Sequence, residues 1–428
     1  MSIASKTPLT AGTTRLISLS NVMPWAFAAL FLLCLPFVFQ SSSALTIMNQ
    51  MAITIVFALS YNMLLGQGGM LSFGHAVYMG LGGFFAMHAM NMVEDGLWLP
   101  LPFLPIVGGL FGMVFAFLIG SFSTRRAGTV FAMISLGVGE LIAACSVIIV
   151  VFFGGEEGIS GDRTMGPPVF GYEFLTQQEV YYLTVVWLLV AALLMYLFSR
   201  TPIGRIANAV RDNEERAEFL GYSQRNVRWI SFCASGFFAG VAGSLFAINF
   251  EILTEENLNL ATSGSILLIT FIGGAGFFVG PIIGAVVFTL LQTVLGLHTE
   301  LWALYLGILF VACVMFFPSG FAGLIAMHRR PLALGKLNLL IKPYLKVAIP
   351  AITSVLSLAA ILEILFHKRH GYGGDHEMHL YGIAFDSGGY QAVAFATIIA
   401  AISLFLVSRV LPEIREAWDN ANHAEDRA

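Results

Sequence analysis

The sequence predicts an all-α, polytopic membrane protein, and three observations support that fold class. The 428 residues are 57% hydrophobic and only 11% charged, whereas soluble domains usually carry about 25% charged residues. Apolar runs of about 20 residues, long enough to cross a bilayer core, recur along the chain. Lys and Arg concentrate in alternate loops, as expected for cytoplasmic loops. We expect about ten transmembrane or re-entrant helices in a main body and two appended C-terminal spans.

The first half of the chain contains most of the regular spans. Residues 1–21 include Lys6 and Arg15 but no acidic residue, so this N-terminus is expected in the cytoplasm. Glycines at the start of 66–92 disfavour a regular helix, which predicts a broken or re-entrant helix there. The remaining predicted spans up to residue 250 are 22–40, 44–65, 103–123, 127–153, 180–199 and 229–250.

The second half contains a run too long for one crossing. Residues 261–298 exceed the length that a core about 30 Å thick requires, and GGAGFFVGP interrupts them at 273–281. Two short helices meeting at Gly276 are predicted, because this places Arg329 and Arg330 on the inner side. Further spans are predicted at 301–318, 345–366 and 389–411, followed by a cytoplasmic tail.

The charges of the loops agree with this topology. Of 21 Lys and Arg, only Arg163, Lys368 and Arg369 fall on the outer side. Three parts of the chain are therefore expected. They are a cytoplasmic segment 1–21, a transmembrane body 22–328 and a C-terminal extension 329–428 with two spans.

The polar segment 200–228, which lies between two apolar runs, is predicted to form a cytoplasmic docking helix. Thr201 suits an N-cap and Pro202 suits the first helical position, while Gly221 follows the last apolar position as a stop. One face is apolar at helical spacing, through Ile206, Val210, Ala217 and Leu220. Charged residues four apart are expected to pair across a turn, namely Arg211 with Glu215 and Asp212 with Arg216. A solvated helix that merely joins two spans is the competing interpretation.

Two glycine-interrupted apolar stretches, 66–83 and 273–284, are predicted to border a transport path. Non-helical backbone inside a membrane requires cover by protein or by a water-filled cavity, and broken helices in two halves of a chain point to a transport site. Close helix packing is the competing explanation for single glycines four apart, such as Gly108 with Gly112, Gly236 with Gly240, and Gly276 with Gly280 and Gly284. The candidate path residues are Asn62, Gln67, Ser72, His75, Glu140, Gly273, Gly274 and Gly276.

Two of these candidates have a second interpretation. His75 either contacts solute or protons, or it bonds to a neighbouring helix, and the second role is favoured. Glu140 lies in the middle of a predicted span, where a carboxylate must face a partner or a wet cavity. It therefore either fixes helix packing or belongs to the path.

The sequence contains no motif for a cofactor, a metal or an energy source. Gly335-Lys336 lacks the upstream glycine of a phosphate-binding loop, and no span carries an ion-relay pattern. The histidine-rich segment 367–379 matches no closed zinc pattern, so a solvated loop is favoured over a weak metal site. The four cysteines lie in apolar runs and are expected to be core residues. The chain is therefore expected to be non-catalytic, to bind no nucleic acid and to be driven by a partner.

Several motifs resemble the branched-chain amino acid family of ABC-importer permeases, in particular its LivM-like subunit. TPIGRIANAVRDNEERAEFLGYS (201–223) resembles the coupling loop of that family, and GQGGMLSFGHAVYMGLGGF (66–84) resembles its glycine-rich stretch. The other similar segments are GGEEGISG (154–161), IGGAGFFVGPIIGA (272–285) and FFPSGFAGL (316–324). Glu156 and Glu157 make the outer loop more acidic than the family pattern, and residues 330–428 lie outside it.

The resemblance implies a permease subunit of a bacterial inner-membrane importer. The implied partners are a second, LivH-like permease subunit, two ATP-binding subunits and a periplasmic solute-binding protein. The implied solutes are branched-chain or other small amino acids, or urea and short amides. Residues implied to couple to the ATP-binding subunits are Arg205, Arg211, Asp212, Asn213, Glu214, Arg216, Ala217, Glu218 and Gly221. A self-contained secondary transporter or channel for a small polar solute, and a membrane scaffold that transports nothing, are the alternatives.

Overall fold

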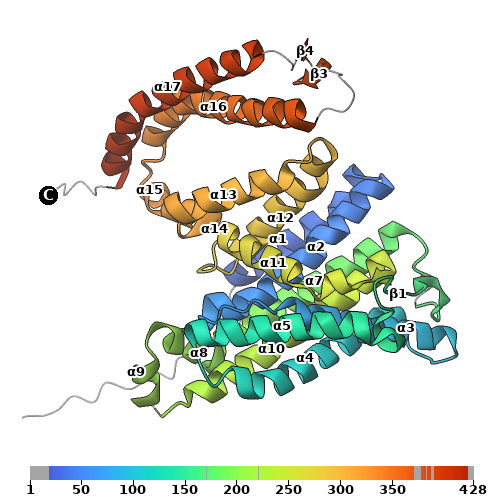
Figure 1. Cartoon of the computed structure of the whole chain (residues 1–428). Coiled ribbons are helices and arrows are strands. Elements are labelled where there is room, and N and C mark those ends of the chain that lie inside the picture. The colour runs from blue at the N-terminus through green and yellow to red at the C-terminus, as the bar shows by residue number, and fades with distance from the viewer. Residues whose placement is uncertain are drawn as a thin grey trace, which may run out of the picture. The chain divides into compact units, whose positions relative to one another are not determined.

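The computed structural model describes residues 19–169, 171–219, 221–370, 377–381, 383–386 and 390–422, and most of them are helical (Figure 1). Within this part of the chain, nine helices are long and apolar enough to cross a membrane. A tenth is formed if the bent pair Trp302–Phe316 and Gly320–Ala333 counts as one span. The predicted all-α polytopic fold is confirmed. The chain divides into two compact units, Met1–His298 with Leu306–Phe321, and Thr299–Tyr305 with Ala322–Ala428.

The first unit holds the helices of the predicted body. Its helices up to the docking segment are α1 (Leu19–Val38), α2 (Ser42–Asn62), the π-helical turn η1 (Met63–Gln67), α3 (Ala76–Glu94), α4 (Leu104–Ser123), α5 (Gly128–Ile148), α6 (Val150–Phe153) and α7 (Gln177–Arg200). They are followed by α8 (Pro202–Asp212), α9 (Glu214–Phe219), α10 (Gln224–Phe250), α11 (Leu260–Gly273), α12 (Gly280–Thr289) and the π-helical turn η5 (Leu290–Val294). Two short strands, β1 (Ile159–Ser160) and β2 (Ile252–Leu253), pair antiparallel.

The core of this unit is built from α3, α4 and α10, which approach closely at glycines. A Cβ on Gly240 would meet the Gly108 carbonyl, and one on Gly112 would meet the Gly236 carbonyl. Backbones come this close only where residues are small. The packing explanation is therefore supported for these four glycines, but nothing lies within 4 Å of a Cβ built on Gly276.

Both predicted breaks are present. The helix that starts at Ser42 runs through η1, and an irregular stretch of residues 68–75 precedes α3. In the second half, α11 ends at Gly273 and α12 begins at Gly280. The prediction of two short helices with Gly276 between them is therefore confirmed.

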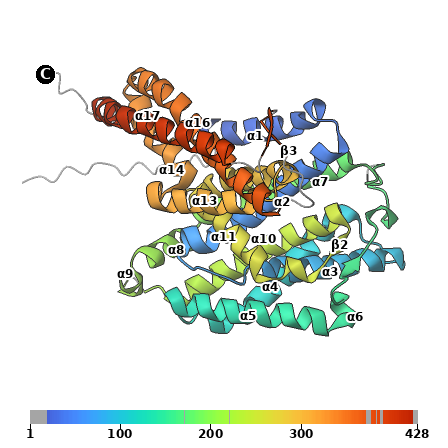
Figure 2. The same ribbon diagram turned by 45° about the horizontal axis from the view of Figure 1, so that its top comes forward.

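The second unit contains the two appended spans, α16 (Asn338–His370) and α17 (Gln391–Asn422), which lie side by side in Figures 1 and 2. The helices α14 (Gly320–Met327) and α15 (Arg329–Ala333) precede them, and the strands β3 (Glu377–Leu380) and β4 (Ile383–Asp386) form a hairpin between them. Most of α13 (Trp302–Phe316) belongs to the first unit. Glu363 on α16 accepts hydrogen bonds from Thr299 Oγ1 at 2.6 Å and from Tyr305 OH at 2.7 Å. His376 of the histidine-rich segment, like residues 1–18, lies outside the described residues.

Candidate coupling and translocation site

The docking segment begins as predicted but is broken once. Thr201 Oγ1 accepts a hydrogen bond from the Gly204 N–H at 3.2 Å, and Pro202 opens α8. The predicted single helix is wrong in one respect, because α8 ends at Asp212 and α9 starts at Glu214. Asn213 between them is extended, with φ of −160°, and its side chain caps α9.

This break also removes the ion pairs expected across one turn. Arg211 and Asp212 end one helix, whereas their expected partners Glu215 and Arg216 belong to the next. Neither expected pair is among the ion pairs of the described residues. Arg211 instead donates from Nε and Nη2 to Asp212 Oδ1, at 2.9 and 2.8 Å.

The buried face of the segment matches the prediction where it is described. Ala207, Val210, Ala217 and Val227 form a cluster, with Ile206 packed against it, while Leu220 lies outside the described residues. Gly221 has φ of +85°, the left-handed conformation that suits a stop. The exposed residues predicted to couple are Arg205, Arg211, Asp212, Asn213, Glu214, Arg216 and Glu218.

An exposed aromatic residue was missed by the sequence-based prediction. Phe219, at the end of α9, is 90% exposed, and Tyr222 close by is also exposed. Phe219 lies nine positions after Val210, which places it on the opposite face of a helix with 3.6 residues per turn. The period of the apolar face was therefore a signal that could have identified it as exposed.

One predicted coupling residue is already paired within the chain. Glu214 forms an ion pair with Arg228, whose side chain is 7% exposed, near the start of α10. Gln224 Nε2 also donates to the Glu214 carbonyl at 3.3 Å. These contacts fasten α9 to α10.

Arg211 links the docking segment to the first glycine break. Its Nη1 donates to the carbonyl of Gly66, in the π-helical turn η1. A Cβ on Gly69, which has φ of +64°, would lie 2.7 Å from Arg211 Cγ. Both the backbone conformation and the space therefore require glycine at position 69.

The two glycine breaks meet each other. Gly66 lies against the Ala275 carbonyl, and Asn62 Nδ2 donates to the Phe277 carbonyl at 3.4 Å. Gly274 has φ of +108°, outside the range that other residues adopt readily. The structure thus brings Asn62 together with the turn between α11 and α12, which includes the candidates Gly273, Gly274 and Gly276.

His75 and Ser72 lie in a buried cluster beside the first break. The Ser60 hydroxyl donates to the Phe57 carbonyl at 2.7 Å, so it accepts from His75 Nε2 at 3.0 Å. Tyr61 OH donates to the Ser72 carbonyl at 3.1 Å. These contacts favour the packing role for His75. Among the described residues, Gln67 Oε1, Ser72 Oγ and His75 Nδ1 are buried without a hydrogen-bond partner.

Glu140 lies apart on α5, on a face that the described part of the chain leaves exposed. Gly137 and Ala144, three residues before and four after it, are exposed on the same face. A carboxylate inside a membrane is costly unless it meets a partner or water, and small residues mark helix interfaces. This composition is typical of a helix face that contacts another subunit or lines a water-filled path.

A cavity of about 160 Å³ lies between α2, α10, α11 and α12. Its polar lining consists of amides and hydroxyls, and no ionisable side chain lines it. Sequence reasoning missed this set, although isolated polar residues in apolar runs were a usable signal. The polar residues are Gln50, Thr54, Asn257, Thr262, Ser265 and Gln292.

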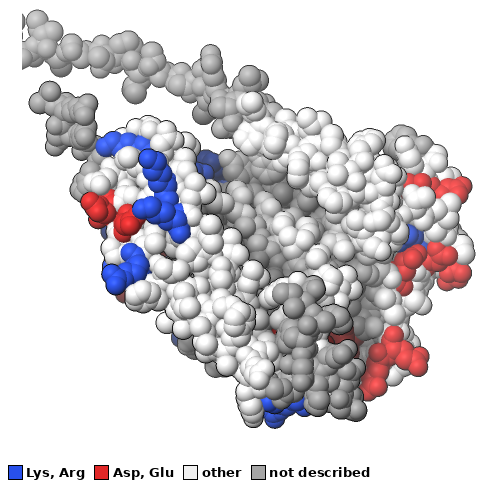
Figure 3. All heavy atoms as spheres, turned by 90° about the horizontal axis from the view of Figure 1, so that it is seen from above, with Lys and Arg blue, Asp and Glu red and all other residues white. Residues whose placement is uncertain are grey.

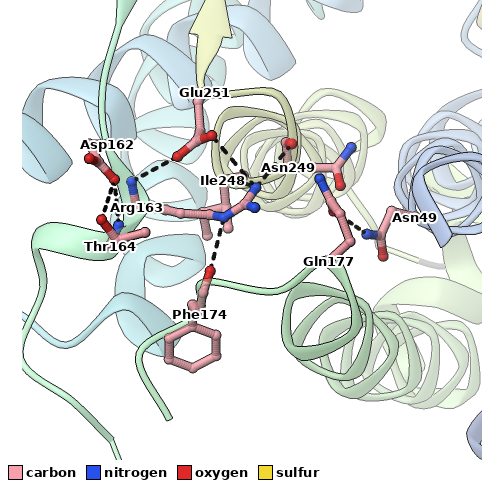
Figure 4. Close-up of polar contacts among 9 residues, drawn as sticks. All are labelled: Asn49, Asp162, Arg163, Thr164, Phe174, Gln177, Ile248, Asn249 and Glu251. Atoms are coloured by element: carbon pink, nitrogen blue, oxygen red, sulfur yellow. Dashed lines mark hydrogen bonds and ion pairs between the residues drawn. The ribbon is translucent and has the colours of Figure 1, made fainter. Parts of the chain in front are cut away.

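The outer loop is fastened to the far end of α10 by Arg163, whose side chain is 8% exposed. Arg163 Nε donates to the Phe174 carbonyl at 3.0 Å, and Nη1 donates to the carbonyls of Ile248 and Asn249 at 3.3 and 3.4 Å (Figure 4). Glu251 accepts from the Arg163 N–H at 3.1 Å. A cation at a helix C-terminus satisfies its free carbonyls, which gives a structural role to this basic residue that was predicted on the outer side.

Figure 3 shows a patch of acidic side chains at its right edge, beside a mostly uncharged surface.

Known sequences resemble this chain over most of the first unit. The family described as "Branched-chain amino acid transport system / permease component" matches residues 43–316. The "High-affinity branched-chain amino acid transport system permease protein LivM" of Escherichia coli is 28% identical over 291 residues, covering 63% of this chain and 67% of that protein. The corresponding LivM of Salmonella typhimurium is 27% identical, covering 65% and 70%. The "Autoinducer 2 import system permease protein LsrC" of Klebsiella pneumoniae is 34% identical over 26% of this chain and 34% of that protein. No solved structure matches.

Proposed function

Because this chain belongs to the family of permease components of branched-chain amino acid transport systems, we propose that it is the LivM-like subunit of an ABC importer. It is a multi-pass membrane protein, placed by the proposal in the bacterial inner membrane with a cytoplasmic N-terminus. Its body is 22–328, and 329–428 is an extension. The proposed partners are a LivH-like permease subunit, two ATP-binding subunits and a periplasmic solute-binding protein. ATP hydrolysis belongs to the partner subunits, and this chain is non-catalytic.

The exposed surface of α8 and α9 is the observation that carries the proposal. The pair is anchored on its buried side, yet it presents Phe219 at 90% exposure beside charged residues. A partly apolar, charged surface on a short helix pair suits a groove on another protein. Arg205, Arg216 and Glu218, together with Phe219, are proposed to contact an ATP-binding subunit.

The cavity beside α2 supports transport of a small solute without net charge. Its volume of about 160 Å³ is close to that of a cavity of about 150 Å³ known to hold benzene. Amides and hydroxyls bind the polar groups of a zwitterion or an amide, while the apolar lining accommodates a short side chain. Branched-chain and other small amino acids, urea and short amides meet this description. Glu140 is proposed to face the same path, at the boundary with the companion permease.

Movement is proposed to follow from the connections of the docking segment. The helices α7 and α10 continue directly from α8 and α9, so displacement of the pair rocks them as rigid bodies. Alternating access by this motion needs no covalent chemistry in this chain.

Charge reversal on α9 tests the proposal. Glu218→Lys is a cleaner variant than Glu214→Lys, because Glu214 also holds Arg228. We expect Glu218→Lys to weaken co-purification of the ATP-binding subunits about tenfold and to lower uptake of radiolabelled leucine equally. Glu173→Lys, an equally exposed reversal in the outer loop, is the matched control and should retain the complex.

Two other outcomes would reject the assignment. A self-contained transporter would take up leucine normally with Glu218→Lys and without bound ATP-binding subunits. A scaffold would show no leucine-stimulated ATP hydrolysis in the reconstituted complex.

A further inference from the structure

Arg211 is committed to contacts inside the chain, although it lies on the docking surface. Its side chain is 37% exposed. Nη1 donates to the Gly66 carbonyl, and Nε and Nη2 both donate to Asp212 Oδ1. Three of its nitrogens are thus engaged, and a planar guanidinium holds such a forked arrangement in one orientation.

The loop that receives Arg211 is shaped around its side chain. Gly69 adopts φ of +64°, and its Cα faces the aliphatic stem of Arg211, so that a Cβ would lie 2.7 Å from Cγ. The carbonyl that accepts the hydrogen bond belongs to Gly66, within the π-helical turn η1. π-Helical turns are uncommon and are found frequently at functional sites.

The same turn touches the second break. Gly66 lies against the Ala275 carbonyl, and Asn62, one turn earlier, donates to the Phe277 carbonyl. A displacement of the Gly66 carbonyl therefore acts on both broken helices. The continuous line of contacts runs from α8 through Arg211 to η1, and from there to the turn between α11 and α12.

We propose that Arg211 is a positioning residue that transmits movement of α8 and α9 to the paired glycine breaks, and that it is not an ATP-binding-subunit contact. This inference rests on the proposed function and specifies how the docking segment reaches the path. It separates two roles within one segment, since Glu218 and Phe219 face outward to dock and Arg211 faces inward to couple.

The test uses the full transporter in proteoliposomes with its binding protein, radiolabelled leucine and ATP. Arg211→Gln should retain the ATP-binding subunits and basal hydrolysis. Uptake and leucine-stimulated hydrolysis should both fall by about tenfold or more, the size of a typical coupling between sites. Arg126→Gln removes the same charge from an exposed site in another inner loop and should change neither quantity.

A conservative variant separates transmission from folding. Arg211→Lys keeps one donor for the Gly66 carbonyl but loses the fork to Asp212, so partial recovery of uptake is expected. Arg211→Lys also provides the measurement if Arg211→Gln does not assemble.

Two results would overturn the inference. Loss of the ATP-binding subunits from an assembled Arg211→Lys permease would make Arg211 a docking contact. Normal leucine-stimulated hydrolysis and uptake in Arg211→Gln would mean that the contact with Gly66 transmits nothing. Failure of the proposed function itself would look different, because the unmodified permease would then recover no ATP-binding subunit.

Discussion

The two ends of α10 are each held by a buried arginine, but the two attachments differ in kind. At the docking end, Arg228 pairs with a single side chain, Glu214, which is 45% exposed. At the outer end, Arg163 binds three backbone carbonyls and Glu251. The two attachments lie about 40 Å apart along α10, and the one at Arg228 is the weaker of the two.

The difference indicates which part of the first unit moves as one body. Pairing of β1 with β2 adds to the outer attachment, so the outer loop and α10 should move together. At the docking end, α9 is joined to α10 by one partly solvated ion pair, by the Gln224 hydrogen bond and by the packing of Ala217 and Val227 in one cluster. Because a partly exposed ion pair contributes little, this attachment depends mainly on packing in the described part of the chain.

The largest predicted effect is removal of the outer arginine. Arg163→Met should lower the free energy of unfolding by about 3 kcal/mol, because buried carbonyls lose their donor and Glu251 loses its partner. Unfolding by denaturant in detergent micelles measures this loss, and proteolysis should reach the outer loop earlier than in the unmodified chain. A loss no larger than that of the matching inner variant would remove the distinction between the two ends.

The matching inner variant, Arg228→Met, should have a smaller effect. Glu214 can be hydrated once Arg228 is gone, so about 1 kcal/mol is expected. The same unfolding measurement applies, and salt should weaken the native pair. Proteolysis at the α8–α9 segment should increase, while the outer loop stays resistant. Equal proteolysis of the α8–α9 segment and the outer loop would contradict the idea that the attachment at Arg228 is the weaker one.

The smallest effect concerns pH at the outer end. Asp162 accepts hydrogen bonds from the N–H and hydroxyl of Thr164 at 2.8 and 2.7 Å, and these bonds lower the pKa of its carboxyl below the ordinary 3.8. A lowered pKa contributes stability above the ordinary value, and this contribution is lost as pH falls through the folded-state pKa. Melting temperatures recorded as pH falls below 4 should therefore decline less steeply for Asp162→Asn. Parallel curves would show that this carboxylate does not strengthen the outer attachment.

The spans were predictable because the thickness of a bilayer determines how long an apolar run must be to cross it. Capping residues then indicate where individual helices begin and end. Thr201 and Pro202 identified the start of α8, and the glycines around Gly276 identified the turn between α11 and α12. The break at Asn213 was not predicted, because asparagine is tolerated within helices. Only the surrounding packing decides that its side chain caps α9 instead.

The site was less predictable, because its contacts join distant parts of the chain. Arg211 and Gly66 are 145 positions apart, and nothing local in either motif indicates the other. In the sequence, Arg163 was only an exception to the rule that basic residues concentrate in cytoplasmic loops. Its role depends on the end of α10, which lies more than 80 positions further along. The polar lining of the cavity likewise comes from separate parts of the chain, namely α2, α11, η5 and Asn257, each contributing one or two ordinary residues.

Two hydroxyl groups that precede the appended spans depend on a carboxylate within them. Thr299 and Tyr305 both donate hydrogen bonds to Glu363 of α16. A gene shortened before codon 363 would remove this acceptor, and a polar group left without a partner away from water is costly. Lineages that gained or discarded these spans should therefore carry compensating changes at positions 299 and 305.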